Sequence, residues 1–259
     1  MIEAFDLTKQ YGTFHAVNHL TLSAGPGELF GFLGPNGAGK STTMKMLAGL
    51  LLPTSGSARI AGYDILRDPL NAKAHLGYMA EDVTLYEKLT GREFLRFIGD
   101  LYRVPAALQT QRIAQLLDWF DLADKANDLV ETYSRGMRQK IALGAVLVHD
   151  PDVLILDEPT SGLDPRAARV VKDLLRDEVR RGKTVLMSTH ILEVAEHMVD
   201  RVGIINGGTL VAVGTLAELR AHARASDASL EDLFLTLTGG AEYQDFALAV
   251  GDGEGVAQP

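Results

Sequence analysis

Short apolar runs alternate with stretches of helical periodicity from about residue 28 to residue 214. The runs at 28–34, 152–159, 184–190 and 201–207 have the apolar centres typical of buried strands. Helical patterns occupy residues 42–52 and 165–179. This alternation favours a mostly parallel sheet with helices on its faces, and therefore an α/β fold.

The N-terminal part has a different pattern. Segments 1–8 and 15–23 are followed by Gly-Pro-Gly-Glu and predict antiparallel strands. We therefore expect an N-terminal antiparallel β subdomain beside the parallel core.

Between about residues 89 and 148 only helical patterns occur. Apolar residues recur there at i, i+3, i+4 and i+7, in two successive sets. The first set is Phe94, Phe97, Ile98 and Leu101, and the second is Ile113, Leu116, Leu117 and Phe120. Both stripes predict core packing, and the segment predicts a helical lobe inserted into the sheet domain.

The chain length of 259 residues suits one large α/β domain or two tightly joined lobes. We expect a single domain over residues 1–238. Residues 239–259 contain four acids, no Lys or Arg and five glycines, a composition that predicts a disordered tail.

Composition narrows the function classes. Hydrophobic residues at 46 % and charged residues at 23 % are ordinary for a soluble folded protein, and the absence of cysteine excludes disulfides and thiolate sites. A net charge of −9 argues against sequence-independent binding of nucleic acid, so no nucleic-acid partner is expected. The N-terminus lacks a signal-peptide pattern, and no apolar run approaches the ~18 residues of a membrane span. A membrane role would therefore act through a partner.

The segment GPNGAGKST, residues 34–42, follows a predicted strand and opens a predicted helix. It fits the phosphate-loop pattern G-x-x-x-x-G-K-[ST], in which glycines let backbone N–H groups approach phosphates and the helix dipole adds positive potential. Lys40 can reach the β- and γ-phosphates, Ser41 can ligate Mg²⁺ and Thr42 can bond the α-phosphate. The candidate nucleotide-binding residues here are Gly34, Asn36, Gly37, Ala38, Gly39, Lys40, Ser41 and Thr42.

Acidic residues follow the apolar run that ends in Leu156. Asp157 can hold Mg²⁺ through water. Glu158 can orient or deprotonate the attacking water, a role worth roughly 10²–10⁴ in rate. His190 ends another predicted strand and could bond the γ-phosphate and hold the Glu158–water geometry; a purely structural histidine remains open.

The segment YSRGMRQK, residues 133–140, places a serine and a glycine among cations before an apolar run. Its residues alone are compatible with three interpretations: a surface patch that binds nucleic acid, an anion-binding site and the ordinary start of a helix.

Five motifs together carry a family resemblance. GPNGAGKST, YSRGMRQK, LILDEP, SGLD and STH occur in the order and approximate spacing of the ATP-binding subunits of ABC transporters, over about residues 1–238. Within that family the chain resembles the drug-exporter and sodium-exporter branch, whose permease is usually a separate chain. YSRGMRQK and SLEDLFLTLTGG (229–240) are similar to that branch.

The resemblance implies roles for several further residues. Ser134 and Gly136 would contact the γ-phosphate of ATP bound to an opposite subunit, so that two copies of the chain would sandwich two ATP. Asp164 would lie at that contact between copies, although it could equally cap the helix beginning at Pro165. Tyr11 matches the aromatic that stacks on adenine.

Three residues depart from the family pattern. Arg135 stands in place of a glycine, Met137 in place of a glutamine, and Glu81 in place of the glutamine that contacts Mg²⁺ and links the two lobes. A carboxylate retains oxygen ligands, so Mg²⁺ binding by Glu81 should survive.

The resulting prediction is an ATPase subunit that uses ATP and Mg²⁺ to drive a separate integral-membrane permease from the cytoplasmic face, with export favoured over import. The groove between the loop 81–86 and the helical lobe is the expected docking surface. Two alternatives are a soluble ABC-type ATPase acting on ribosomes or DNA and a nucleotide switch without turnover. The cargo, and whether the pair is a homodimer or a heterodimer, are not encoded in these motifs.

Overall fold

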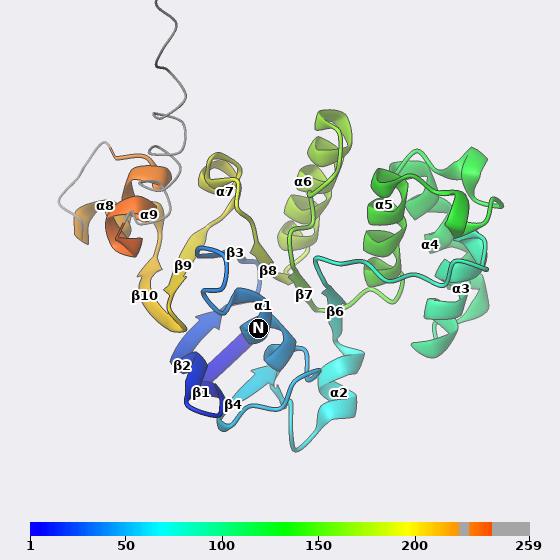
Figure 1. Cartoon of the computed structure of the whole chain (residues 1–259). Coiled ribbons are helices and arrows are strands. Elements are labelled where there is room, and N and C mark those ends of the chain that lie inside the picture. Colours follow the sequence, from blue (N-terminus) through cyan, green and yellow to red (C-terminus); the bar gives the residue numbers. More distant parts are fainter. Residues whose placement is uncertain (223–227, 240–259) are drawn as a thin grey trace, which may run out of the picture.

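The computed structural model describes residues 1–222 and 228–239 and contains two sheets (Figure 1). The first is four-stranded, in the order β2-β1-β4-β5, with antiparallel pairing. Its strands are β1 (Ile2–Tyr11), β2 (Phe14–Ala24), β4 (Ser55–Ile60) and β5 (Tyr63–Asp64). The expected antiparallel subdomain is therefore present.

The second sheet is six-stranded, in the order β10-β9-β3-β8-β7-β6. Its strands are β3 (Leu29–Leu33), β6 (Leu76–Met79), β7 (Val153–Leu156), β8 (Thr184–Ser188), β9 (Arg201–Asn206) and β10 (Thr209–Gly214). Every pair is parallel except β9 with β10. This arrangement confirms the predicted α/β class, and it aligns the carboxyl ends of five strands at one edge.

Helices surround the sheets. In Figure 1, α3, α4 and α5 gather on the right, and α7, α8 and α9 lie on the left. They are α1 (Lys40–Leu47), α2 (Pro69–Ala74), α3 (Gly91–Leu101), α4 (Ala106–Trp119), α5 (Arg135–Leu147), α6 (Pro165–Arg180), α7 (Leu192–Met198), α8 (Leu216–His222) and α9 (Leu230–Thr238), with 3₁₀ turns η1 (Ala123–Lys125) and η2 (Val130–Thr132).

The helix expected over 42–52 ends earlier than its apolar pattern predicts. Gly49 has a φ of 63° and follows the helix cap Ala48, which is a common way for a helix to end. Leu50 and Leu52 beyond it are 61 % and 69 % exposed. The apolar run in the sequence therefore extends past the end of the helix into leucines that lie on the surface.

The alternating faces of β7 explain its continuous apolar run. Val153 and Ile155 belong to a core cluster with the antiparallel sheet and α1, whereas Leu154 and Leu156 belong to a cluster with α5 and α6. Successive side chains of a strand point to opposite faces, so a strand covered on both faces is apolar throughout.

The helical segment between β6 and β7 contains α3, α4 and α5. The stripe in α4 is buried as predicted, with all four residues at most 4 % exposed. The stripe in α3 was predicted to be core along its whole length, and this was wrong. Phe97 is 36 % and Leu101 62 % exposed, while Phe94 is buried. Helical spacing identifies an apolar face but does not say whether protein covers all of it.

No helix in the described ranges, 1–222 and 228–239, is long and apolar enough to cross a membrane. The tail expected over 239–259 lies outside the described residues except for Gly239, which caps α9 in a left-handed conformation. The domain bounds 1–238 and 89–148 stay predictions.

Candidate nucleotide-binding site

The phosphate loop joins β3 to α1 in a conformation that requires glycine. Gly39 has a φ of 107°, and a Cβ there would lie 2.4 Å from the backbone oxygen of Ala16. A Cβ on Gly34 would lie 2.3 Å from the backbone oxygen of Ile205. The loop is thus pressed against backbone on two sides, and only glycine fits.

Lys40 turns back across the loop that it ends. Its Nζ lies 2.5 Å from the backbone oxygen of Gly34 and 3.0 Å from that of Pro35. The N-cap of α1, Gly39, supplies no side-chain cap, so the first-turn N–H groups retain their capacity for an anion. This geometry can hold a phosphate, with the Lys40 cation beside the loop carbonyls of Gly34 and Pro35. Asn36 and Gly37 are exposed, whereas Ser41 and Thr42 are half-buried.

Asp157 and Glu158 follow β7 directly and are both buried. The Ser188 hydroxyl, at the end of the neighbouring strand β8, donates to Asp157 Oδ1 at 2.5 Å and accepts the N–H of Glu158 at 3.0 Å. One hydroxyl therefore fixes both acidic residues. Sequence reasoning missed this role, although Ser188 is the first residue of the STH motif.

His190 lies beside Glu158 as the sequence suggested. Its Nδ1 is 2.9 Å from Glu158 Oε2, and its side chain is 67 % exposed while that of Glu158 is 8 % exposed. A buried carboxylate thus meets an exposed imidazole at the same sheet edge as the phosphate loop. This pair can hold a water molecule and a phosphate oxygen in defined positions.

The segment YSRGMRQK, residues 133–140, called the signature segment below, begins α5 at an exposed serine. Ser134 is the N-cap, and its Oγ accepts the N–H of Met137 at 3.3 Å. A Cβ on Gly136 would lie 3.5 Å from the backbone oxygen of Gly162, so the YSRGMRQK and SGLD segments of one chain are neighbours. Helix start and anion site are compatible readings, because an N-cap leaves other first-turn N–H groups available.

Asp164 caps α6, because its Oδ1 accepts the N–H of Ala167 at 2.8 Å. This backbone hydrogen bond is the main cause that holds the pKa of Asp164 below its usual range, and the charge of Lys140 adds to it. The capping alternative is therefore realised, and the contact with a second copy stays a prediction.

Tyr11 and Glu81 lie on the surface. Tyr11 is 52 % exposed, and Lys9 Nζ lies 5.0 Å from the centre of its ring. Glu81 is exposed in the loop after β6. Exposure leaves both side chains accessible to a nucleotide or metal, and their roles stay predictions.

In the part of the chain that the structure describes, no three His, Cys, Asp or Glu residues cluster to hold a metal. A hydroxyl on Ser41 and a buried carboxylate on Asp157 nevertheless suit Mg²⁺, which keeps several waters and binds substrate phosphates instead of filling an all-protein cage. The donor set fits the expected metal.

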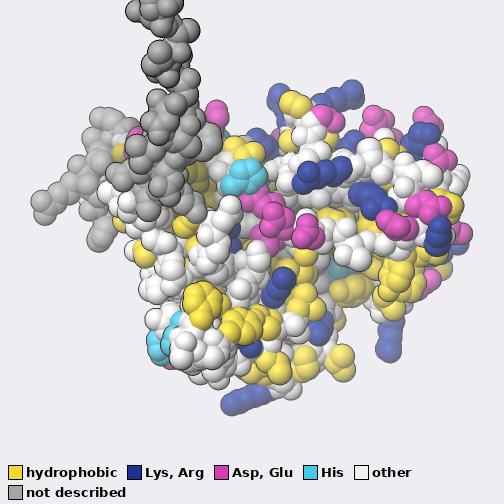
Figure 2. All heavy atoms as spheres, in the orientation of Figure 1, with side chains coloured by type: hydrophobic (Ala, Val, Ile, Leu, Met, Phe, Trp, Pro, Cys, Tyr) yellow, Lys and Arg dark blue, Asp and Glu magenta, His cyan; other side chains and the backbone are white. Residues whose placement is uncertain are grey.

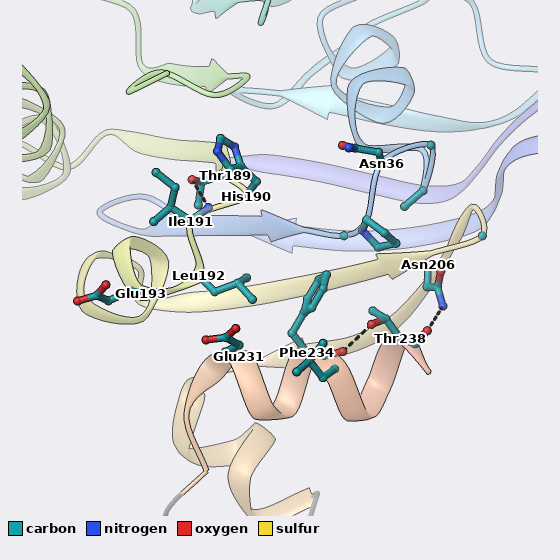
Figure 3. Close-up of a pocket in the computed structure, with 16 residues that line it drawn as sticks. Asn36, Thr189, His190, Ile191, Leu192, Glu193, Asn206, Glu231, Phe234 and Thr238 are labelled. Carbon is teal, nitrogen blue, oxygen red and sulfur yellow. Dashed lines mark hydrogen bonds between the residues drawn. The ribbon is translucent and has the colours of Figure 1, made fainter. Parts of the chain in front are cut away.

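A cavity of about 730 Å³ adjoins the outer side of the phosphate loop (Figure 3). Asn36 approaches it from the loop, His190 from the segment after β8, and Phe234 from α9. Asn206 Nδ2 donates to the backbone oxygen of Thr238 at 3.2 Å and ties α9 to the end of β9. The sequence motif SLEDLFLTLTGG gave no sign that this helix lies beside the loop.

Comparison with known proteins decides the family. The family model described as ABC transporter matches residues 17–161. The chain belongs to the ABC transporter family. It is similar to the probable multidrug ABC transporter ATP-binding protein YbhF of Escherichia coli (strain K12), with 41 % identity over 92 % of this chain and 41 % of that protein.

Two other relatives of this ABC protein are drug-resistance proteins. The linearmycin resistance ATP-binding protein LnrL of Bacillus subtilis (strain 168) is 38 % identical over 85 % of this chain and 70 % of its own length. The daunorubicin/doxorubicin resistance ATP-binding protein DrrA of Streptomyces peucetius is 42 % identical over 85 % of this chain and 66 % of its own. The chain thus spans about two fifths of YbhF and about two thirds of the others.

Solved structures agree with the ABC ATPase fold. An ATP-binding subunit of an ABC transporter superposes with a TM-score of 0.89 at 34 % identity, over 92 % of this chain and 99 % of that one. A dimeric ATP-binding cassette in a post-hydrolysis state, bound to ADP and Pi, gives 0.76 at 25 % identity, over 83 % of this chain and 99 % of that one.

Proposed function

We propose that this chain binds and hydrolyses ATP and thereby drives a membrane permease carried on a separate chain. The observation that carries the proposal is the meeting of Asp157, Glu158 and His190 at the carboxyl edge of the sheet that also carries the phosphate loop. The phosphate loop and Lys40 hold the phosphates, and Tyr11 stacks on the adenine.

In this mechanism Glu158 accepts a proton from the attacking water, and His190 fixes the carboxylate through its Nδ1 contact. Ser188 keeps Asp157 and Glu158 in place. Mg²⁺, when bound by Ser41, Asp157 and Glu81, supplies charge neutralisation for the phosphates. The protein therefore acts through positioning and electrostatics.

Two copies would complete two sites. Each chain has one phosphate loop and one signature segment. Ser134, Gly162 and Asp164 are exposed, and Gly136 lies against Gly162 of the same chain. A head-to-tail pair about a two-fold axis places each signature segment over the other copy's phosphate loop. ATP then joins the copies, and hydrolysis releases them.

The permease would dock in an apolar groove between the loop after β6 and the helical segment. A cavity of about 350 Å³ lies there, lined by Val83, Leu85 and Ile98 among others. Tyr86 packs edge-on against Phe97 with ring centres 5.2 Å apart, and Leu101 is exposed nearby on α3. Figure 2 shows hydrophobic side chains gathered over the lower part of this helical group. We infer a cytoplasmic helix of an export permease as the occupant and the cytoplasmic membrane face as the location.

Replacement of Glu158 by Gln tests the catalytic part. We expect MgATP turnover to fall roughly 10²- to 10⁴-fold while nucleotide still binds. Light scattering should then report a dimer in saturating MgATP and a monomer without it. Unchanged turnover would refute Glu158 as the base, and a monomer at saturating MgATP would refute the two-copy arrangement.

A pull-down of the tagged chain from native membranes in mild detergent tests the partner. We expect a stoichiometric integral-membrane protein to be recovered. Recovery of only ribosomal or DNA-bound proteins would overturn the transporter proposal and leave the ATP site standing.

A further inference from the structure

Gln139 joins α5 to the turn at residues 157–161 that follows β7, called the catalytic turn below. It is 7 % exposed and lies about one turn into α5. Its Nε2 is 3.2 Å from the backbone oxygen of Glu158 and 3.2 Å from that of Pro159. A residue of the helical segment therefore donates to the backbone of the catalytic carboxylate.

Glu158 has an unusual backbone that needs such support. Its φ is 51°, in the left-handed region that non-glycine residues seldom occupy. Ser188 Oγ holds its N–H at 3.0 Å, and Ser161 N–H and Gln139 both donate to its carbonyl oxygen. Strained residues at functional sites persist only when their surroundings fix them. The direction of the Glu158 carboxylate thus depends on these contacts.

Arg138, the residue before Gln139, extends from a different side of α5. Arg138 Nη2 lies 2.5 Å from Glu87 Oε1, in the loop after β6 that borders the apolar groove. The Arg138 side chain is the main cause that keeps the pKa of Glu87 below its usual range. Adjacent residues of one helix thus contact the groove loop and the catalytic turn.

We propose that Gln139 is a positioning residue that sets the Glu158 carboxylate according to the position of α5. This inference rests on the proposed function, in which Glu158 is the base. Because the Gln139 amide is part of α5, the support of the Glu158 carbonyl depends on how α5 packs against the turn that follows β7.

The variant Gln139→Met removes the amide donor. Methionine has a similar size to glutamine and is also compatible with a helix. A misplaced catalytic group costs up to about 10²-fold, so we expect kcat to fall roughly 10- to 100-fold with the KM for ATP little changed. The matched control is Gln109→Met in α4. Gln109 is 2 % exposed, and its Nε2 donates to the backbone oxygen of Arg96 at 3.0 Å and to Asp100 Oδ1 at 2.9 Å.

Both glutamine variants should melt earlier, because each loses a buried donor. Only Gln139→Met should lose kcat when turnover is normalised to folded protein. Equal kcat in both variants would overturn the proposal and leave Gln139 a structural residue. If Gln139→Met does not fold, Gln139→Asn decides, because its shorter side chain retains the amide but cannot span the distance; full kcat there would also overturn the proposal.

A double variant separates this inference from the proposed function. In single-turnover measurements the effect of Gln139→Met should vanish in a Glu158→Gln background, because both act through one carboxylate. Additive losses would overturn the coupling. If Glu158→Gln alone retains turnover, the proposed base is wrong; if it abolishes turnover while Gln139→Met does not, only the positioning role fails.

Discussion

Ser188 Oγ lies 2.5 Å from Asp157 Oδ1 and 3.0 Å from the backbone nitrogen of Glu158. The hydroxyl donates to the first and accepts from the second, so its one donor and one of its two acceptor positions are used. All three residues are buried. A single side chain on β8 therefore connects the Asp157 carboxylate with the backbone of Glu158, directly after the neighbouring strand β7.

The variant Ser188→Ala should destabilise the fold and slow turnover together. It leaves a buried N–H and a buried carboxylate oxygen each short of one partner, at a cost of about 1–3 kcal/mol. We expect a lower midpoint in urea unfolding and at least a tenfold loss of ATPase activity.

Thr184→Val is the matched control for Ser188→Ala, because it lies on the same strand at the opposite end. Thr184 Oγ1 donates to the backbone oxygen of Gly25 at 2.8 Å, away from the acidic residues. We expect its loss to cost about 1 kcal/mol without changing kcat. Normal activity in Ser188→Ala would contradict the bridging role.

The variant Gly39→Ala should abolish nucleotide binding and destabilise the loop. The added Cβ would lie 2.4 Å from a backbone oxygen that cannot move aside cheaply, in addition to the cost of a left-handed alanine. The control is Gly62→Ala in the turn between β4 and β5, where φ is 87° and a Cβ meets nothing within 4 Å. Binding of a fluorescent ATP analogue and thermal melting would check both.

The Gly62→Ala control should lose only about 1–2 kcal/mol of stability and bind nucleotide normally. Similar melting and binding for the two alanine variants would show that close packing of the phosphate loop is unimportant.

The variant Phe97→Asp should break the docking of the permease without affecting ATP hydrolysis by the isolated chain. A charge placed among the groove side chains would have to be desolvated on docking. Leu70→Asp is the control, because Leu70 is 81 % exposed on α2. Co-purification from membranes should be lost with Phe97→Asp and kept with Leu70→Asp. Retention of the permease by Phe97→Asp would place the interface elsewhere.

Folding stability should fall as the pH drops from about 6.5 to about 4 through His149. The pKa of His149 is lowered to about 4, chiefly by burial; the charges of Lys183 and Arg112 act in the same direction, and the Leu76 carbonyl and Asp150 oppose them. Its Nε2 lies 3.1 Å from the backbone oxygen of Leu76, and its ring stacks on Tyr102. The folded protein keeps the ring neutral in this range while the unfolded chain takes up a proton.

The pKa difference for His149 corresponds to roughly 3 kcal/mol. The variant His149→Phe keeps an aromatic ring against Tyr102 and removes the titration. Urea unfolding across pH 7 to 4 should therefore give a flatter dependence for the variant. Parallel curves for the two proteins would assign the acid sensitivity to other groups.

The sequence by itself determined the fold class and predicted the chemistry of the loop at residues 34–42. Apolar runs bounded by turns predicted β3, β7, β8 and β9, because a strand buried on both faces must be apolar throughout. The loop motif between strand and helix predicted a phosphate site at residues 34–42, and the structure shows that backbone approaches Gly34 and Gly39 too closely for a Cβ.

Only the tertiary structure decided which surfaces are covered and which distant residues meet. Phe97 and Leu101 share the spacing of core residues yet are exposed, because periodicity marks an apolar face and not its partner. Ser188 and Gln139 meet Glu158 across 30 and 19 residues of chain. Such contacts depend on strand register and on helix placement against the sheet, which follow from packing of the whole core and not from any local pattern.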